Sequence, residues 1–157
     1  MELGSIHSGC GWSVVFSSKA DFKIDKGCSN LNVIVVDDEP LNLTLIGALI
    51  GKIEGCHPVC FSDPEIALEW CMGNEVALAI TDYSMPELDG VEFVHRFLKL
   101  PGKEDVPVLM LTGTAGVTVR FRALMAGATE LMEKPFEAKR LTKWIEKFIV
   151  RHARVAN

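Results

Sequence analysis

The sequence predicts an α/β fold in which five strands form a doubly wound parallel sheet of the (βα)5 type. Two observations lead to this prediction. Five short runs are almost entirely apolar and rich in β-branched residues, which is typical of strands buried on both faces. Segments with helical periodicity or helix-start signals alternate with these runs, and this alternation favours a parallel sheet covered by helices on both sides.

Two strand–helix units open the regular part of the chain. The strands are expected over residues 31–36 and 57–61, and the helix between them over residues 41–53. The second helix follows Ser62-Asp63-Pro64-Glu65, which has the pattern of a capping box with Ser62 as N-cap. Proline near each helix start fits the first turn, where backbone N–H groups have no helical partner.

Three further units follow, with strands expected over residues 76–81, 106–111 and 129–133 and a helix over residues 91–100. Four apolar residues at helical spacing mark the fourth helix and give it one apolar face (Val117, Phe121, Leu124 and Met125). The last helix has the same kind of face (Leu141, Trp144, Ile145, Phe148 and Ile149). Five such units suit the flavodoxin-like strand order 2-1-3-4-5, with its switch point between strands 1 and 3.

Composition limits the class of protein. The chain has 157 residues, of which 48% are hydrophobic, so one domain with a sizeable core is expected over residues 31–152. Residues 1–30 are rich in Gly, Ser and Lys without a sustained period and are interpreted as a flexible or loosely packed extension. Residues 153–157 are a short tail. The formal net charge of −5 argues against a general nucleic-acid binder.

The location of the protein follows from two negative observations. No stretch approaches the roughly 20 apolar residues that span a bilayer, and the N-terminus lacks the basic start of a signal peptide. The chain is therefore expected in the cytoplasm and away from membranes. Its five cysteines are an odd, irregularly spaced set, so Cys60 and Cys71 are interpreted as small core residues.

Polar side chains gather where the strands end. Asp37 and Asp38 follow strand 1, Asp82 ends strand 3, Thr112 ends strand 4 and Lys134 follows strand 5. In sheets of this topology ligands bind at the carboxyl ends of the strands, near the switch point. Three carboxylates, a hydroxyl and an ammonium group are therefore expected at one edge of the sheet.

These residue types indicate phosphoryl chemistry beside a metal ion. Three close acids repel one another, and an oxygen-only ligand set favours Mg²⁺. A carboxylate can act as nucleophile and form an aspartyl phosphate, while a cation holds the charge of the phosphoryl group. The adjacent pair Asp37 and Asp38 suits metal binding, and the isolated Asp82 suits the acceptor. Spacing alone does not decide between them.

Four motifs carry a family resemblance: Val35-Val36-Asp37-Asp38-Glu39-Pro40, Thr81-Asp82-Tyr83-Ser84-Met85-Pro86 with Asp89-Gly90, Leu111-Thr112-Gly113, and Lys134-Pro135-Phe136. Together they resemble the receiver domains of two-component response regulators, including chemotaxis receivers, over residues 31–152. The stretch from Val33 to Lys134 is also similar to receivers that precede cyclic-di-GMP phosphodiesterase domains.

The resemblance implies a role for each site residue. It implies that Asp82 accepts a phosphoryl group from a sensor histidine kinase or a phosphotransfer protein. Asp38, Asp82 and the backbone carbonyl of Ser84 would ligate Mg²⁺, with Asp37 acting mainly through water. It further implies that Thr112 moves toward the phosphate and Lys134 pairs with it, and that the bond before Pro135 is cis.

One position departs from the family. Receivers often carry Tyr or Phe three residues before the lysine as a rotating switch, and this chain has Leu131 there.

The expected partners are a downstream protein or output domain, and receivers often dimerise through their last two helices. The family members are signalling switches, so no enzymatic activity beyond self-phosphorylation from a donor and autodephosphorylation is expected.

Two other functions compete with this interpretation. One is an Mg²⁺-dependent phosphatase or hydrolase with an aspartyl nucleophile, but such enzymes usually carry a second acid where this chain has Ser84. The other is an interaction module that is not phosphorylated, against which the complete set of Asp82, Thr112 and Lys134 argues. Asp37 and Asp38 could also simply cap the first helix, which needs only one of them.

Overall fold

The computed structural model describes residues 30–114 and 116–155 of the chain. Apart from Asn30, the predicted extension over residues 1–30 lies outside the described residues, as do residues 156–157 of the predicted tail.

In the described part of the chain, five parallel strands form one sheet in the order β2-β1-β3-β4-β5, which confirms the predicted flavodoxin-like (βα)5 topology. The strands are β1 (Leu31–Val36), β2 (Cys56–Phe61), β3 (Leu78–Asp82), β4 (Val108–Thr112) and β5 (Glu130–Glu133). Every residue of β3 and β4 is buried, and this explains why their sequences are apolar without alternation.

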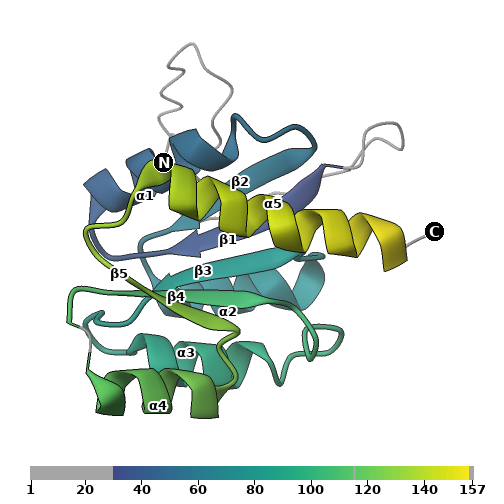
Figure 1. Ribbon diagram of the computed structural model, residues 1–157. Helices are drawn as coiled ribbons and strands as arrows, with labels where there is room; N and C mark the ends of the chain where they lie inside the picture. The colour runs from purple at the N-terminus through teal and green to yellow at the C-terminus, as the bar shows by residue number, and fades with distance from the viewer. Residues whose placement is uncertain (1–29, 115, 156–157) are drawn as a thin grey trace, which may run out of the picture.

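Within residues 30–114 and 116–155, five helices cover the two faces of the sheet (Figure 1). They are α1 (Pro40–Ile50), α2 (Pro64–Gly73), α3 (Gly90–Phe97), α4 (Val117–Ala126) and α5 (Ala138–Val155). α1 and α5 enclose one hydrophobic cluster with side chains such as Ile46, Leu141 and Ile145. α2, α3 and α4 enclose the other, where Phe93 and Phe97 stack with ring centroids 5.9 Å apart.

The limits of α2 and α1 differ from those predicted from the sequence. The N-cap of α2 is Asp63 and not Ser62, because the Asp63 side chain accepts a hydrogen bond of 2.8 Å from the Glu65 backbone N–H. Asp63 is the better cap here since Pro64 then occupies the first helical position, where no N–H is needed. α1 also ends at Ile50, three residues before the predicted end.

The apolar face predicted for α4 lies on the opposite side of the helix from the core. Val117 is 89% exposed and Phe121 62% exposed, and Leu124 and Met125 are exposed as well. Ala123 is the buried residue of α4, and Val119 and Ala126 are partly buried against the same cluster. The side of α4 that faces the core therefore consists of smaller residues, which the spacing of large apolar residues did not reveal.

The two cysteines assigned to the core are buried free thiols. Burial raises the pKa of Cys60 to about 11 and that of Cys71 to about 12, although Lys103 opposes the rise at Cys71.

Among the helices of the described residues, none is long and apolar enough to cross a bilayer.

Candidate functional site

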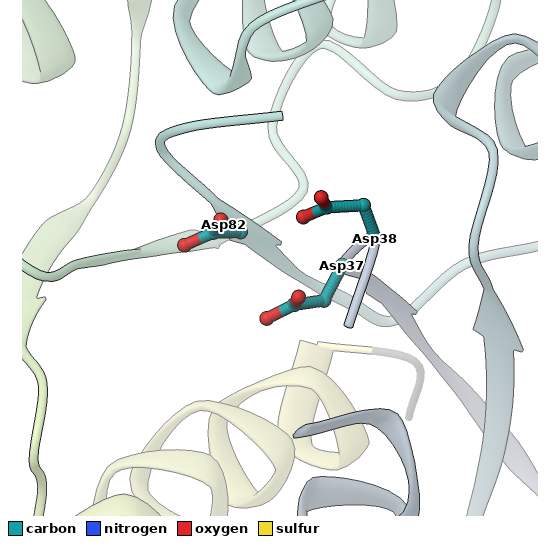
Figure 2. Close-up of side chains that lie close together, drawn as sticks. All are labelled: Asp37, Asp38 and Asp82. Atoms are coloured by element: carbon teal, nitrogen blue, oxygen red, sulfur yellow. The ribbon is translucent and has the colours of Figure 1, made fainter. Parts of the chain in front are cut away.

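Three carboxylates meet at the carboxyl ends of β1 and β3. Asp37 and Asp38 directly follow β1, and Asp82 is the last residue of β3. Because β1 and β3 are hydrogen-bonded neighbours, the three side chains face one small space (Figure 2). Each offers a carboxylate oxygen within 4.8 Å of the others. The sheet topology thus brings together the acids that the sequence pointed to.

Lys134 lies just after β5 and reaches across to these acids. Its Nζ donates to Asp82 Oδ1 at 2.9 Å and to Asp37 Oδ2 at 3.1 Å. Its backbone N–H donates to the Thr112 carbonyl at 2.7 Å, and the Lys134–Pro135 bond is cis, as the resemblance implies. Lys134 therefore belongs to the acidic group at this edge of the sheet.

The charges of these groups are strongly coupled. Burial raises the pKa of Asp82 above its ordinary value, the Lys134 ammonium opposes that rise, and the charges of Asp37 and Asp38 add to it. Burial alone would lower the pKa of Lys134, but its hydrogen bonds to Asp82 and Asp37 raise it. Lys134 is therefore protonated at neutral pH, and one ammonium group faces three acids.

Asp37 and Asp38 have different surroundings. Asp37 is 1% exposed, and it accepts hydrogen bonds from the Glu39 N–H at 2.8 Å and from Asn42 Nδ2 at 3.0 Å. Asp38 is exposed and makes no hydrogen bond with the described residues. Asp37 thus helps to hold the start of α1, while Asp38 has free oxygens beside Asp82.

Thr112 ends β4 at the same edge of the sheet. Its hydroxyl donates to the Thr114 carbonyl at 2.9 Å and accepts from the Thr114 N–H at 3.2 Å. The hydroxyl is therefore bonded to its own loop and not to Asp82. Ser84 lies exposed in the loop after β3, and Leu131 is buried in β5 opposite Met110.

Two features of the site were not predicted from the sequence. A Cβ atom at Gly90 would overlap the Asp82 carbonyl oxygen, so only glycine fits the start of α3 there. Arg122 of α4 donates to the Tyr83 hydroxyl at 3.1 Å. The Asp89-Gly90 pair could have signalled the first feature, whereas nothing in the sequence links Tyr83 to a residue 39 positions away.

The sequence is similar to those of known proteins. The family model described as response regulator receiver domain matches residues 33–146. The cyclic di-GMP phosphodiesterase response regulator RpfG of Xanthomonas campestris pv. campestris (strain 8004) is 35% identical over 127 residues. This match covers 80% of the chain and 32% of RpfG, so the chain spans about a third of that curated relative.

Two solved structures have the same fold. The chemotaxis protein CheY4 of Vibrio cholerae has a TM-score of 0.72 at 24% identity, over 76% of this chain and 98% of that one. The receiver domain of the sensor histidine kinase PA1611 from Pseudomonas aeruginosa PAO1, solved with magnesium coordinated in its active-site cleft, has a TM-score of 0.69 at 24% identity. It covers 76% of this chain and 98% of that one.

Proposed function

The chain belongs to the family of response regulator receiver domains, and on that premise we propose that it is a phosphorylation-controlled switch with Asp82 as the phosphoryl acceptor. One observation carries the proposal: Lys134 Nζ lies 2.9 Å from Asp82 Oδ1 within a group of three converging carboxylates. The family itself consists of signalling domains, and the acceptor, the metal and the phosphodonor are our assignments.

Asp82 has the properties of a nucleophile. Oδ1 is held by Lys134, whereas Oδ2 has no hydrogen bond to the described residues and can attack phosphorus. In the proposed step an Asp82 oxygen forms a bond to the phosphorus of a phosphohistidine as the nitrogen–phosphorus bond breaks, and the imidazole leaves. The Lys134 ammonium stabilises the negative charge on the phosphoryl oxygens.

The donor set fits Mg²⁺. Asp38, Asp82 and the Ser84 backbone carbonyl would bind the ion, and Asp37 would act mainly through water, since its oxygens already bind Asn42, Lys134 and a backbone N–H. Bound Mg²⁺ would neutralise the acids and the phosphoryl oxygens. The exposed Asp38 leaves the ion accessible to the phosphodonor.

Thr112 and Lys134 are the residues proposed to bind the phosphoryl group and respond to it. Thr112 would exchange its bond to the Thr114 carbonyl for one to a phosphoryl oxygen, which would move the segment that leads to α4. Leu131 cannot repeat the aromatic rotation found in other receivers, so this segment would carry the signal without it.

The proposed partners follow from the chemistry. The phosphodonor would be a phosphohistidine of a sensor kinase or phosphotransfer protein in the cytoplasm, and the output would be a change in binding to a downstream protein or domain. We propose residues 31–152 as the receiver domain and residues 1–30 as a separate extension. The phosphodiesterase activity named for RpfG concerns a protein of which this chain matches 32%.

Incubation with acetyl phosphate and Mg²⁺, followed by intact-mass measurement, tests the proposal. One phosphoryl group should add to the wild-type chain and none to Asp82→Asn. Asp105→Asn, an exposed aspartate just before β4 and so away from this edge, is the matched control and should phosphorylate normally.

An adduct that survives Asp82→Asn or that forms without Mg²⁺ would contradict the assignment. Steady turnover of an unrelated phosphoester, such as p-nitrophenyl phosphate, would favour the hydrolase. Absence of any adduct would leave the interaction module as the better interpretation.

A further inference from the structure

Arg122 on α4 contacts two residues near the proposed acceptor. Its Nη1 donates to the Tyr83 hydroxyl at 3.1 Å, and its Nη2 lies 3.8 Å from Asp89 Oδ2. Tyr83 directly follows Asp82, and Asp89 is the N-cap of α3, where Oδ1 accepts from the Glu92 N–H at 2.9 Å. These three residues, here named the Arg122 bridge, connect the end of β3, the start of α3 and the middle of α4.

Tyr83 is fixed firmly to the site. Its N–H donates to the Leu111 carbonyl at 2.7 Å, and its carbonyl accepts from the Gly90 N–H at 2.9 Å. Its side chain packs against the buried cluster between the sheet and the helices α2, α3 and α4. Any displacement of the Asp82 backbone therefore changes the position of the hydroxyl that Arg122 binds.

α4 packs on the core mainly through small side chains, and its Val119 and Ala126 are only partly buried there. Ala123 is its buried residue, and its N-cap, Gly116, makes no side-chain cap hydrogen bond. A helix that buries little apolar surface gains little free energy from its position, so polar contacts contribute a larger share of what holds it. The Arg122 bridge is such a contact, and it lies on the side of α4 near the acceptor.

We propose that Arg122 is a positioning residue that couples α4 to Asp82, by holding α4 in the arrangement of the unphosphorylated chain. This rests on the proposed function. Thr112 would leave the Thr114 carbonyl to bind the phosphoryl group, and α4 begins only three residues after Thr114. Holding α4 in place opposes that movement, and because coupling is reciprocal, removing the bridge favours the phosphorylated arrangement.

The affinity for beryllofluoride in the presence of Mg²⁺ measures this coupling, since beryllofluoride bound to the Asp82 carboxylate mimics an aspartyl phosphate. Tyr83→Phe removes the hydroxyl and Arg122→Met removes the donor, and each should tighten beryllofluoride binding about two- to fivefold. The double variant should equal Arg122→Met, because that substitution already removes the hydrogen bond to Tyr83 together with the contact to Asp89. Arg120→Met, an exposed arginine on the same helix, is the matched control and should bind like wild type.

Tyr83 also provides a direct spectroscopic signal, because it is the single tyrosine of the chain. Fluorotyrosine labelling gives one ¹⁹F resonance, which should shift when beryllofluoride binds and should already be shifted in unliganded Arg122→Met. The resonance of Arg120→Met should match wild type. This readout distinguishes loss of the bridge from a general loss of stability, which thermal melting of each variant monitors.

The outcomes separate the two proposals. If wild type shows no Mg²⁺-dependent beryllofluoride binding, the proposed function fails and the coupling fails with it. If wild type binds but Tyr83→Phe and Arg122→Met bind beryllofluoride no more tightly than wild type does, or if the double variant binds more tightly than Arg122→Met, the coupling alone is overturned.

Discussion

α3 and α4 lie side by side on the same face of the sheet, yet they are attached to it in different ways (Figure 1). α3 buries Phe93, Val94 and Phe97 in the core. α4 buries Ala123 and leaves Phe121 and Val117 exposed to solvent. Their starts differ too, since Asp89 caps α3 and Gly116 provides no side-chain cap for α4.

This difference has a physical consequence for a switch. Burying a phenylalanine contributes roughly 1.5–3 kcal/mol, so α3 cannot move without a large loss of stability. α4 has little such burial to lose, and elements of this kind move most readily. In the proposed switch, a change at Asp82 would be transmitted through the loosely attached helix without unfolding of the chain. The predictions below test this contrast, from the largest expected effect to the smallest.

Phe97→Ala should lower the free energy of unfolding by about 3–5 kcal/mol, because it leaves a cavity where a fully buried ring stacks on Phe93. Urea denaturation measures the change. A loss below about 1 kcal/mol would mean that α3 is no more firmly attached than α4, and the contrast would not hold.

Ala123→Leu should cost about 1–3 kcal/mol, because α4 approaches the core through this small, fully buried side chain and the extra atoms have no space. The same urea experiment applies. Met125→Ala is the control on the exposed side of α4, and it should change stability far less. Equal effects of the two substitutions would show that the assigned inner side of α4 is wrong.

Phe121→Ser should change the free energy of unfolding by about 0.5 kcal/mol or less, since the ring is 62% exposed. Binding of an apolar dye such as ANS should fall, because the exposed apolar area on α4 becomes smaller. A loss of stability as large as that of Phe97→Ala would mean that the ring is buried in solution.

Gly116→Ser should stabilise the chain by roughly a few tenths of a kcal/mol, because serine can cap α4 and the extended backbone at this position suits an N-cap. A Cβ atom there meets no other atom within 4 Å. Hydrogen exchange in the first turn of α4 should slow while exchange in α3 stays unchanged. Faster exchange in α4 would contradict the prediction.

Much of the fold was predictable because strands that are buried on both faces consist almost entirely of apolar residues. The continuous apolar runs that became β3 and β4 predicted buried parallel strands, and the topology rules then set the strand order. Helix limits were less certain, since Ser62 and Asp63 can both cap a helix and only the backbone conformation selects Asp63. The end of α1 was also placed three residues too late.

The sequence by itself determined the fold class and the residues that gather at one edge of the sheet, because strand ends and motif order can be read along the chain. Tertiary structure decided the rest. It set which side of α4 faces the core, because that depends on how the helix docks and not on its own apolar pattern. It also brought Arg122 to Tyr83 and made Lys134 the partner of Asp82 and Asp37, since these contacts join segments far apart in the chain.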